Sequence, residues 1–196
     1  GKINLQMYSF MDGTMNDSRE NLKLASEMGY DGVELFGPNF EIPAEELKAL
    51  LTELHLEPVS MHAPKTDMVE SLIPLAESLE MKFIGIGMEC MIDDEAVHTF
   101  ANTLNRIGKV CAEHGLTLTY HNHTQEFVPC GDKRVIDVLM EETNPDYVSF
   151  ELDAGWCAAA GFDPIELVQT YSGRIKLIHV KESSKVIGPQ PPMDFE

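Results

Sequence analysis

The chain has 196 residues, 43% of them hydrophobic, which is enough for one sizeable core. Its 33 acidic and 14 basic residues give a formal charge of -19, which disfavours nucleic acid and anionic membrane surfaces as partners. The sequence contains neither a run of about 18 apolar residues nor a signal-peptide pattern. We therefore expect a cytoplasmic protein, with a single domain over residues 1–196.

Cysteine spacing excludes two common kinds of site. The four cysteines are widely scattered and form no CxxC pair of the kind found in zinc knuckles and redox centres. We expect reduced thiols at Cys90, Cys111, Cys130 and Cys157.

Seven strand-like segments follow one another along the chain, each separated from the next by a helix-like segment. A strand–helix repeat of this length predicts parallel strands with helices packed outside them. The strands are expected to begin near residues 3, 32, 57, 82, 116, 147 and 175.

The intervening helices are recognised mainly by their ends. Capping Asp or Ser residues, first-turn prolines and terminal glycines mark most boundaries, and Pro74 predicts a kink or a late start in the third helix. The expected helices span residues 18–28, 44–54, 67–79, 94–113, 133–142 and 164–171.

Alternation within the strands distinguishes two parallel architectures. Doubly wound open sheets usually have near-continuous apolar strands, whereas barrel strands present one face to the helices and another to the axis. Here Val148, Phe150 and Leu152 alternate with polar residues, and the other strands divide in the same way. No GxGxxG motif follows the first strand. We therefore expect an α/β fold, a (β/α) TIM-type barrel.

Only seven of the eight strands of such a barrel are visible. After Lys181 no further strand pattern follows, so we expect the domain to be incomplete at its C-terminal end, unless a residual loop closes the barrel differently or a partner supplies the gap. An open edge between the first and seventh strands would favour association, which makes a homodimer a reasonable hypothesis.

Imidazoles and carboxylates gather at the expected C-terminal ends of the strands, where barrel enzymes place their catalytic groups. Buried together, they would be costly without a cation, and a divalent metal with mixed oxygen and nitrogen ligands would resolve that cost. Mn²⁺, Mg²⁺, Co²⁺ and Zn²⁺ are all chemically acceptable. The residues concerned are Glu34, His62, Glu89, His121, His123, Asp153 and His179.

Several motifs resemble the xylose-isomerase-like TIM-barrel superfamily of sugar phosphate isomerases and epimerases. The resemblance covers nearly the whole chain, and the last three motifs together are fairly specific. It implies a metal site built from acidic and histidine residues on strands five to eight. The motifs are GYDGVELFG (29–37), VSMHAP (59–64), TYHNHTQEF (119–127), ELDAGW (151–156) and IHVKE (178–182).

The resemblance implies roles for individual residues and also exposes departures from the family pattern. The strand-six aspartate falls on Asp153 and the strand-seven histidine on His179. His121 stands where many members carry a strand-five glutamate, so His121, His123 and Glu126 are candidates to replace it. The strand-eight glutamate lies beyond the end of the sequence.

Other positions correspond to substrate contacts in the family. His62 resembles the strand-three histidine and Glu34 the strand-two glutamate, while Trp156 replaces a substrate-binding histidine of many relatives. Lys181 either contacts substrate or pairs with Glu151. The expected catalytic residues are Glu34, Glu126 and His121, the substrate-binding residues are His62, His123, Trp156 and Lys181, and the metal ligands are Asp153, His179 and His121.

The leading hypothesis is a metal-dependent isomerase or epimerase of a sugar or sugar phosphate, acting by proton transfer through an enediolate. A lyase or dehydratase on the same barrel is the alternative, because β-elimination begins with the same proton abstraction. The replaced strand-five carboxylate also leaves open a relative that binds sugar without catalysis. The phosphodiesterase branch is disfavoured by the charge of -19.

Overall fold

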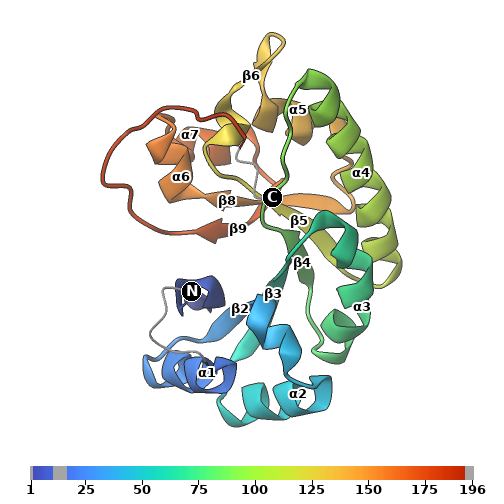
Figure 1. Ribbon diagram of the computed structural model, residues 1–196, viewed down its shortest axis with the longest axis vertical. Coiled ribbons are helices and arrows are strands. Elements are labelled where there is room, and N and C mark those ends of the chain that lie inside the picture. The colour runs from blue at the N-terminus through green and yellow to red at the C-terminus, as the bar shows by residue number, and fades with distance from the viewer. Residues whose placement is uncertain (1, 11–16, 193–196) are drawn as a thin grey trace.

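Seven parallel strands form one curled sheet in the order β1–β2–β3–β4–β5–β8–β9 (Figure 1). This computed structural model describes residues 2–10 and 17–192. Each strand begins within one residue of the position expected from the sequence, and the TIM-barrel-type fold is confirmed. The strands are β1 Asn4–Gln6, β2 Gly32–Phe36, β3 Glu57–Ala63, β4 Phe83–Ile86, β5 Thr117–His121, β8 Val148–Asp153 and β9 Ile175–His179.

The sheet curls into an open barrel with a seam between its first and last strands. Among the described residues, β1 pairs only with β2 and β9 only with β8. A cavity of about 580 Å³ lies along this seam and is lined from both edges.

Helices cover the outer face of the curl (Figure 1). The first helix is capped by Asp17, whose side chain accepts a hydrogen bond from the backbone N–H of Arg19, and Asp93 caps the longest helix in the same way through Ala96. The helices are α1 Ser18–Glu27, α2 Ala44–Glu53, α3 Val69–Ser78, α4 Asp94–Glu113, α5 Val135–Glu142, α6 Ala154–Ala159 and α7 Pro164–Thr170, with short 3₁₀ helices at Met7–Phe10, Gly37–Glu41, Thr66–Met68 and Gln125–Phe127.

Three local features differ from the sequence expectation. The third helix begins at Val69, after a short 3₁₀ turn, and continues through Pro74. A small antiparallel hairpin, β6 Pro129–Cys130 with β7 Lys133–Arg134, replaces the expected start of α5 and projects at the top of Figure 1. Strands of two residues are too short to show an alternation of polar and apolar residues in the sequence. Helix α6 was also not anticipated.

The core lies between the outer face of the sheet and the helices. In β8 every residue is buried, with Val148, Phe150 and Leu152 on the helix side. Leu104 and Ile107 of α4 are buried in the same cluster, and each such side chain contributes about 1.5–3 kcal/mol by leaving water. The alternating polar residues of β8 are therefore held inside the curl, where they form the site described next.

None of the helices in the described part of the chain has the length and apolar character needed to cross a bilayer.

Candidate active site and metal centre

Asp153 is the centre of the polar cluster inside the curl. It is the last residue of β8, it is completely buried, and its Oδ1 accepts a hydrogen bond from the backbone N–H of Trp156, which caps helix α6. The side-chain oxygen of Asn122 accepts a 2.9 Å hydrogen bond from the backbone N–H of Asp153. The strand end and the helix start thus hold the carboxylate rigidly, with Oδ2 facing the interior.

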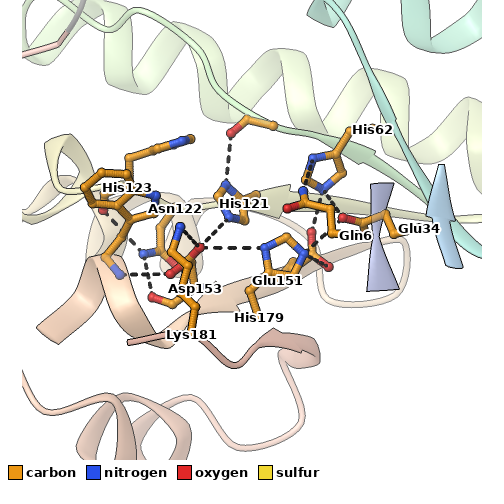
Figure 2. Close-up of polar contacts among 12 residues, drawn as sticks. Gln6, Glu34, His62, His121, Asn122, His123, Glu151, Asp153, His179 and Lys181 are labelled. Atoms are coloured by element: carbon orange, nitrogen blue, oxygen red, sulfur yellow. Dashed lines mark hydrogen bonds and ion pairs between the residues drawn. The ribbon is translucent and has the colours of Figure 1, made fainter. Parts of the chain in front are cut away.

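Three side chains converge on Oδ2 of Asp153 (Figure 2). His121 Nε2 lies 3.1 Å away, His179 Nδ1 3.7 Å away and Lys181 Nζ 2.9 Å away. One ligand atom each from His121, Asp153 and His179 lies within 4.8 Å of the others. This three-residue cluster comes from β5, β8 and β9 and has the donor set N₂O, which suits a divalent transition metal.

The Nδ1 atom of His121 already has a hydrogen-bond partner. Nδ1 lies 3.1 Å from the carbonyl oxygen of Gly87, which can only accept a hydrogen bond, so Nδ1 carries a proton. Nε2 is therefore the nitrogen that faces Asp153 and is able to bind a cation. The carbonyl group of Gly87, just after β4, thus sets the orientation of the His121 ring.

A second group of four side chains lies on the other side of the His179 ring (Figure 2). His62 Nε2 is 2.6 Å from Glu151 Oε2 and 3.3 Å from Glu34 Oε1. His179 Nε2 is 3.0 Å from Glu34 Oε1 and 3.1 Å from Glu151 Oε1. Glu34, His62 and Glu151 are all buried, so two carboxylates and two imidazoles form a closed set of contacts.

Two glycines, Gly85 on β4 and Gly87 just after it, make room for the His62 ring. A Cβ on Gly85 would lie 2.8 Å from His62 Cδ2, and one on Gly87 would lie 3.2 Å from Nδ1. The small residues at these inward positions therefore let an imidazole from β3 lie across β4.

The protonation of the cluster follows from its charges. Burial lowers the pKa of His179, but contacts with Asp153, Glu151 and Glu34 outweigh it and raise that pKa to about 12. Burial likewise opposes charge on His62, while Glu34 and the hydrogen bond to Glu151 raise its pKa. The pKa values of Glu151 and Asp153 are lowered: burial opposes the shift, and the imidazoles, together with Lys181 at Asp153, overcome it.

An aromatic and cationic surface borders the three-residue cluster. Lys181 Nζ lies 4.6 Å from the centre of the Trp156 ring, and the His123 ring lies 5.6 Å from Trp156. Burial, with the neighbouring His121, lowers the pKa of His123 to about 3, so its ring is neutral near pH 7. Its buried Nδ1 has no hydrogen-bond partner in the described part of the chain and is free for a ligand.

Two acidic residues from the sequence analysis lie elsewhere. The carboxylate of Glu126 accepts hydrogen bonds from the Tyr120 hydroxyl at 2.7 Å, the Gln125 amide at 2.9 Å and the His123 backbone N–H at 2.7 Å. It thus holds its own loop together, and burial raises its pKa. Glu89 accepts hydrogen bonds from the Thr66 hydroxyl and the Cys90 backbone.

The seam cavity reaches this site. Glu34, Glu151, His179 and Lys181 line it together with edge residues of β1 and β9. Its volume of about 580 Å³ lies within the range typical of small-molecule sites, roughly 300–1,000 Å³.

A sequence model of the family described as "Xylose isomerase-like TIM barrel" matches residues 22–191. The chain belongs to this family. The family resemblance noted from the motifs is thereby confirmed, and the open curl of seven strands is its fold in this chain.

Individual relatives show the likeness in more detail. Inosose dehydratase of Geobacillus kaustophilus is 34% identical over 91 residues, which are 46% of this chain and 29% of that protein. A sugar phosphate isomerase/epimerase from Parabacteroides distasonis superposes with a TM-score of 0.77 at 24% identity, covering all of this chain and 84% of the other. A zinc-bound IolI protein gives a TM-score of 0.73 at 13% identity, covering 95% of this chain and 75% of the other. The match spans less than a third of the length of the curated dehydratases.

Glu151 has other partners than the one expected from the sequence. Lys181 was the expected partner, whereas the structure places Glu151 against His62 and His179, and Lys181 against Asp153. Glu151 alternates with the apolar residues of β8, and this alternation indicated that its side chain faces the interior. The 89 residues that separate it from His62 left the partner itself undetectable.

Proposed function

We propose that this chain is a metal-dependent enzyme that removes the proton from a carbon next to a carbonyl group in a polyhydroxylated, sugar-like substrate. The observation that carries the proposal is the three-residue cluster of His121, Asp153 and His179, beside a cavity of small-molecule size. Three protein ligands leave coordination positions for substrate oxygens, as in catalytic metal sites.

The donor set fits a divalent cation. His121 Nε2, His179 Nδ1 and Asp153 Oδ2 would hold it, and the buried carboxylate would balance part of its charge. Such a cation would supply Lewis-acid polarisation of the carbonyl and would stabilise the negative charge of an enediolate.

Glu34 is our candidate for the base. Its Oε1 lies 3.0 Å from His179 Nε2 and its side chain lines the cavity, so the carboxylate lies beside the ring that would ligate the cation. Glu126 is not part of this assignment, because its oxygens accept three hydrogen bonds within its own loop. His121 serves as a ligand in this proposal.

The substrate would be held by the groups that border the cluster. Trp156 and His123 offer ring surfaces against which the C–H face of a sugar can pack, and Lys181 can donate to a substrate oxygen. His62 is kept in place by Glu151 on the inner side of the same space.

Two outcomes can follow proton removal. Return of the proton to a neighbouring atom or to the other face gives isomerisation or epimerisation, which the sugar phosphate isomerase/epimerase fold neighbours favour as an analogy. Loss of a β-hydroxyl as water gives dehydration, with the C–H electrons forming the new double bond and an acid such as Lys181 protonating the leaving oxygen. The 32–35% identity to inosose dehydratases favours this second outcome.

The experiment is a substrate panel in D₂O. Keto sugars, their phosphates and keto-cyclitols are incubated with protein loaded with Mn²⁺, Mg²⁺, Co²⁺ or Zn²⁺ and followed by proton NMR. Metal-dependent loss of the signal next to the carbonyl supports the proposal, and the product distinguishes isomerisation from dehydration. Substrate binding without exchange for any metal would instead indicate a relative that binds without catalysis.

A further inference from the structure

We propose that the interior of the curl holds a second site for a divalent cation, formed by Glu34, His62 and Glu151, which we call the second site. It lies on the other side of the His179 ring from the three-residue cluster and shares no ligand with it (Figure 2). The existence of the second site does not depend on the proposed reaction. Only its effect on activity does.

Three strands bring the ligands of the second site together. Glu34 lies on β2, His62 on β3 and Glu151 on β8, and all three side chains are buried. One ligand atom from each lies within 4.8 Å of the others. His62 Nε2 is 3.3 Å from Glu34 Oε1, which matches the spacing of about 3.3 Å between ligands bound tetrahedrally at roughly 2.0 Å. The 2.6 Å contact between His62 Nε2 and Glu151 Oε2 would have to open slightly.

Neighbouring polar groups orient two of these ligands. The Ser60 hydroxyl donates a hydrogen bond to Glu34 Oε2, which leaves Oε1 facing the His62 ring. The side-chain amide of Gln6 lies beside His62 Nδ1, with its Nε2 atom 3.5 Å away. An amide can turn its oxygen to accept from Nδ1–H, and His62 Nε2 then keeps its lone pair for a cation. Outer hydrogen bonds of this kind usually support metal ligands.

The charges at this point favour a cation. Two buried carboxylates, those of Glu34 and Glu151, approach the same nitrogen of His62. A single N–H can donate well to only one of them, whereas a divalent cation in its place would contact both carboxylates at once. Carboxylates taken out of water are stabilised chiefly by such direct contact with positive charge.

The second site also has an entry path. Glu34 and Glu151 both line the seam cavity of about 580 Å³, so an ion can reach them from the open edge of the sheet. Ser60 lines the same cavity. Ligands, supporting hydrogen bonds and access are therefore all present, as a metal site requires.

An independent observation is a buried hydroxyl that lacks a partner. Thr119 on β5 is 1% exposed, and its Oγ1 has no hydrogen-bond partner in the described part of the chain. A Cβ on Gly85 would lie 2.9 Å from this Oγ1 and 2.8 Å from Cδ2 of His62, so the hydroxyl lies beside the His62 ring. An unsatisfied buried hydroxyl is costly, and a water bound to a cation at the second site is a partner that would satisfy it.

The second cation should bind more weakly than the first. The two sites flank one imidazole ring, that of His179, so a cation already held by the three-residue cluster would repel one that enters the second site. The contact between His62 and Glu151 must also open. We therefore expect the second cation to dissociate during gel filtration, so its binding has to be measured at equilibrium.

Occupation of the second site should inhibit the reaction, and this consequence alone rests on the proposed function. Glu34 is the candidate base of that reaction, and a carboxylate bound to a cation is a poor proton acceptor. Deuterium exchange into the substrate should therefore rise as the first site fills and fall as the second site fills. Exchange that stays at its maximum with both sites filled would overturn the inhibitory role.

The site itself is tested by titrating the whole protein with Mn²⁺ alone, using electron paramagnetic resonance to measure the free ion. The wild type should bind about two equivalents at saturation and His62→Asn about one. Glu151→Gln keeps the shape of its side chain and should lose the same weaker equivalent, so the result does not depend on a single variant. Circular dichroism checks that both variants fold.

Surface histidines provide the matched control. His98 and His114 lie 2.9 Å from Glu142 and Glu77 on exposed helix surfaces, where an ion can bind weakly. The double variant His98→Asn/His114→Asn should still bind about two equivalents. Loss of the weaker equivalent from this variant, with its retention in His62→Asn, would identify an adventitious ion only and would overturn the proposal.

A second readout reports how close the two ions are. Two Mn²⁺ ions on either side of one imidazole ring should couple magnetically and broaden the spectrum of the fully loaded wild type, whereas His62→Asn should give the spectrum of an isolated ion. A folded His62→Asn protein that binds as many equivalents as the wild type would overturn the second site. His121→Asn should lose the other equivalent. Unchanged binding in His121→Asn would instead overturn the metal centre of the proposed function, so the two failures are distinguishable.

Discussion

The Nζ atom of Lys181 lies 2.9 Å from Oδ2 of Asp153, the same oxygen that faces His121 and His179. Nζ also lies 4.6 Å from the centre of the Trp156 ring. The ammonium group thus occupies the point between the three-residue cluster and the aromatic surface. A cation bound at Asp153 would compete for Oδ2 and release Lys181 toward a substrate oxygen.

Substitution of this lysine should separate metal binding from substrate binding. Lys181→Met removes a competing positive charge, so metal affinity should be unchanged or higher. KM should rise by about 10- to 100-fold, since a hydrogen bond to a charged group contributes ~1.5–3 kcal/mol. Steady-state kinetics with the substrate identified by the panel measures this. Lys109→Met, on the exposed face of α4, is the control, and a lower metal affinity in Lys181→Met would contradict the expected competition.

Gly155 should be required for the position of Lys181. A Cβ at residue 155 would lie 2.5 Å from Lys181 Cγ and 3.0 Å from its carbonyl oxygen, so the side chain must move. Gly155→Ala should therefore raise KM in the same direction as Lys181→Met. In the double variant the second substitution should add little, because both changes act on one contact. Fully additive effects would show that the glycine acts independently of the lysine.

The alternation of polar and apolar residues made the barrel predictable from the sequence. Each of the seven strands presents inward groups to one interior, so the sequence predicts that Asp153, His179 and His121 lie near one another, as they do in the structure. The alternation along a strand specifies the face of the sheet on which a side chain lies, but not the residue that the side chain contacts. It therefore could not show that Glu126 turns back to the Tyr120 hydroxyl, six residues earlier in the chain.

The same alternation could not predict which residues contact one another across the barrel. The hydrogen bond between His62 and Glu151 joins β3 to β8, and the contact of Glu34 with His179 joins β2 to β9. Such pairs depend on the curl of the sheet and on space left by Gly85 and Gly87. Neither is encoded in a local pattern.

An ion pair remote from the site should make stability depend on acid. Burial alone would raise the pKa of Asp137, but hydrogen bonds from Arg134 and Tyr171 lower it below its usual value. A lowered carboxyl pKa stabilises the fold above the ordinary aspartate value of about 3.9, and this stabilisation is lost as pH falls through the folded-state pKa.

Asp137→Asn should therefore lower the free energy of unfolding by about 2 kcal/mol at pH 7, a figure reduced for the partial exposure of Arg134. The difference from wild type should shrink as the pH falls below about 4. Urea unfolding at several pH values measures it, with the exposed Asp132→Asn as the control. A difference that grows in acid would contradict the assigned sign.

Thiol reactivity should follow burial. Burial raises the pKa of Cys111 to about 12 and that of Cys157 to about 11, and Cys130 is also buried. Cys90 is partly exposed. A disulfide reagent should therefore modify Cys90 rapidly in the native protein and all four thiols after denaturation. Rapid native labelling should disappear in Cys90→Ser; fast modification of Cys111 would contradict the packing of α4 on the sheet.

The most direct test of the metal centre is the divalent-metal content of the wild type and of Asp153→Ala, measured by plasma mass spectrometry after metal loading and gel filtration. Circular dichroism would check that the variant folds without its α6 cap. We expect about one retained equivalent in the wild type, as for a single metal centre, and loss of that metal from the folded variant. Equal metal content in the two proteins would contradict the assignment of Asp153 as a ligand.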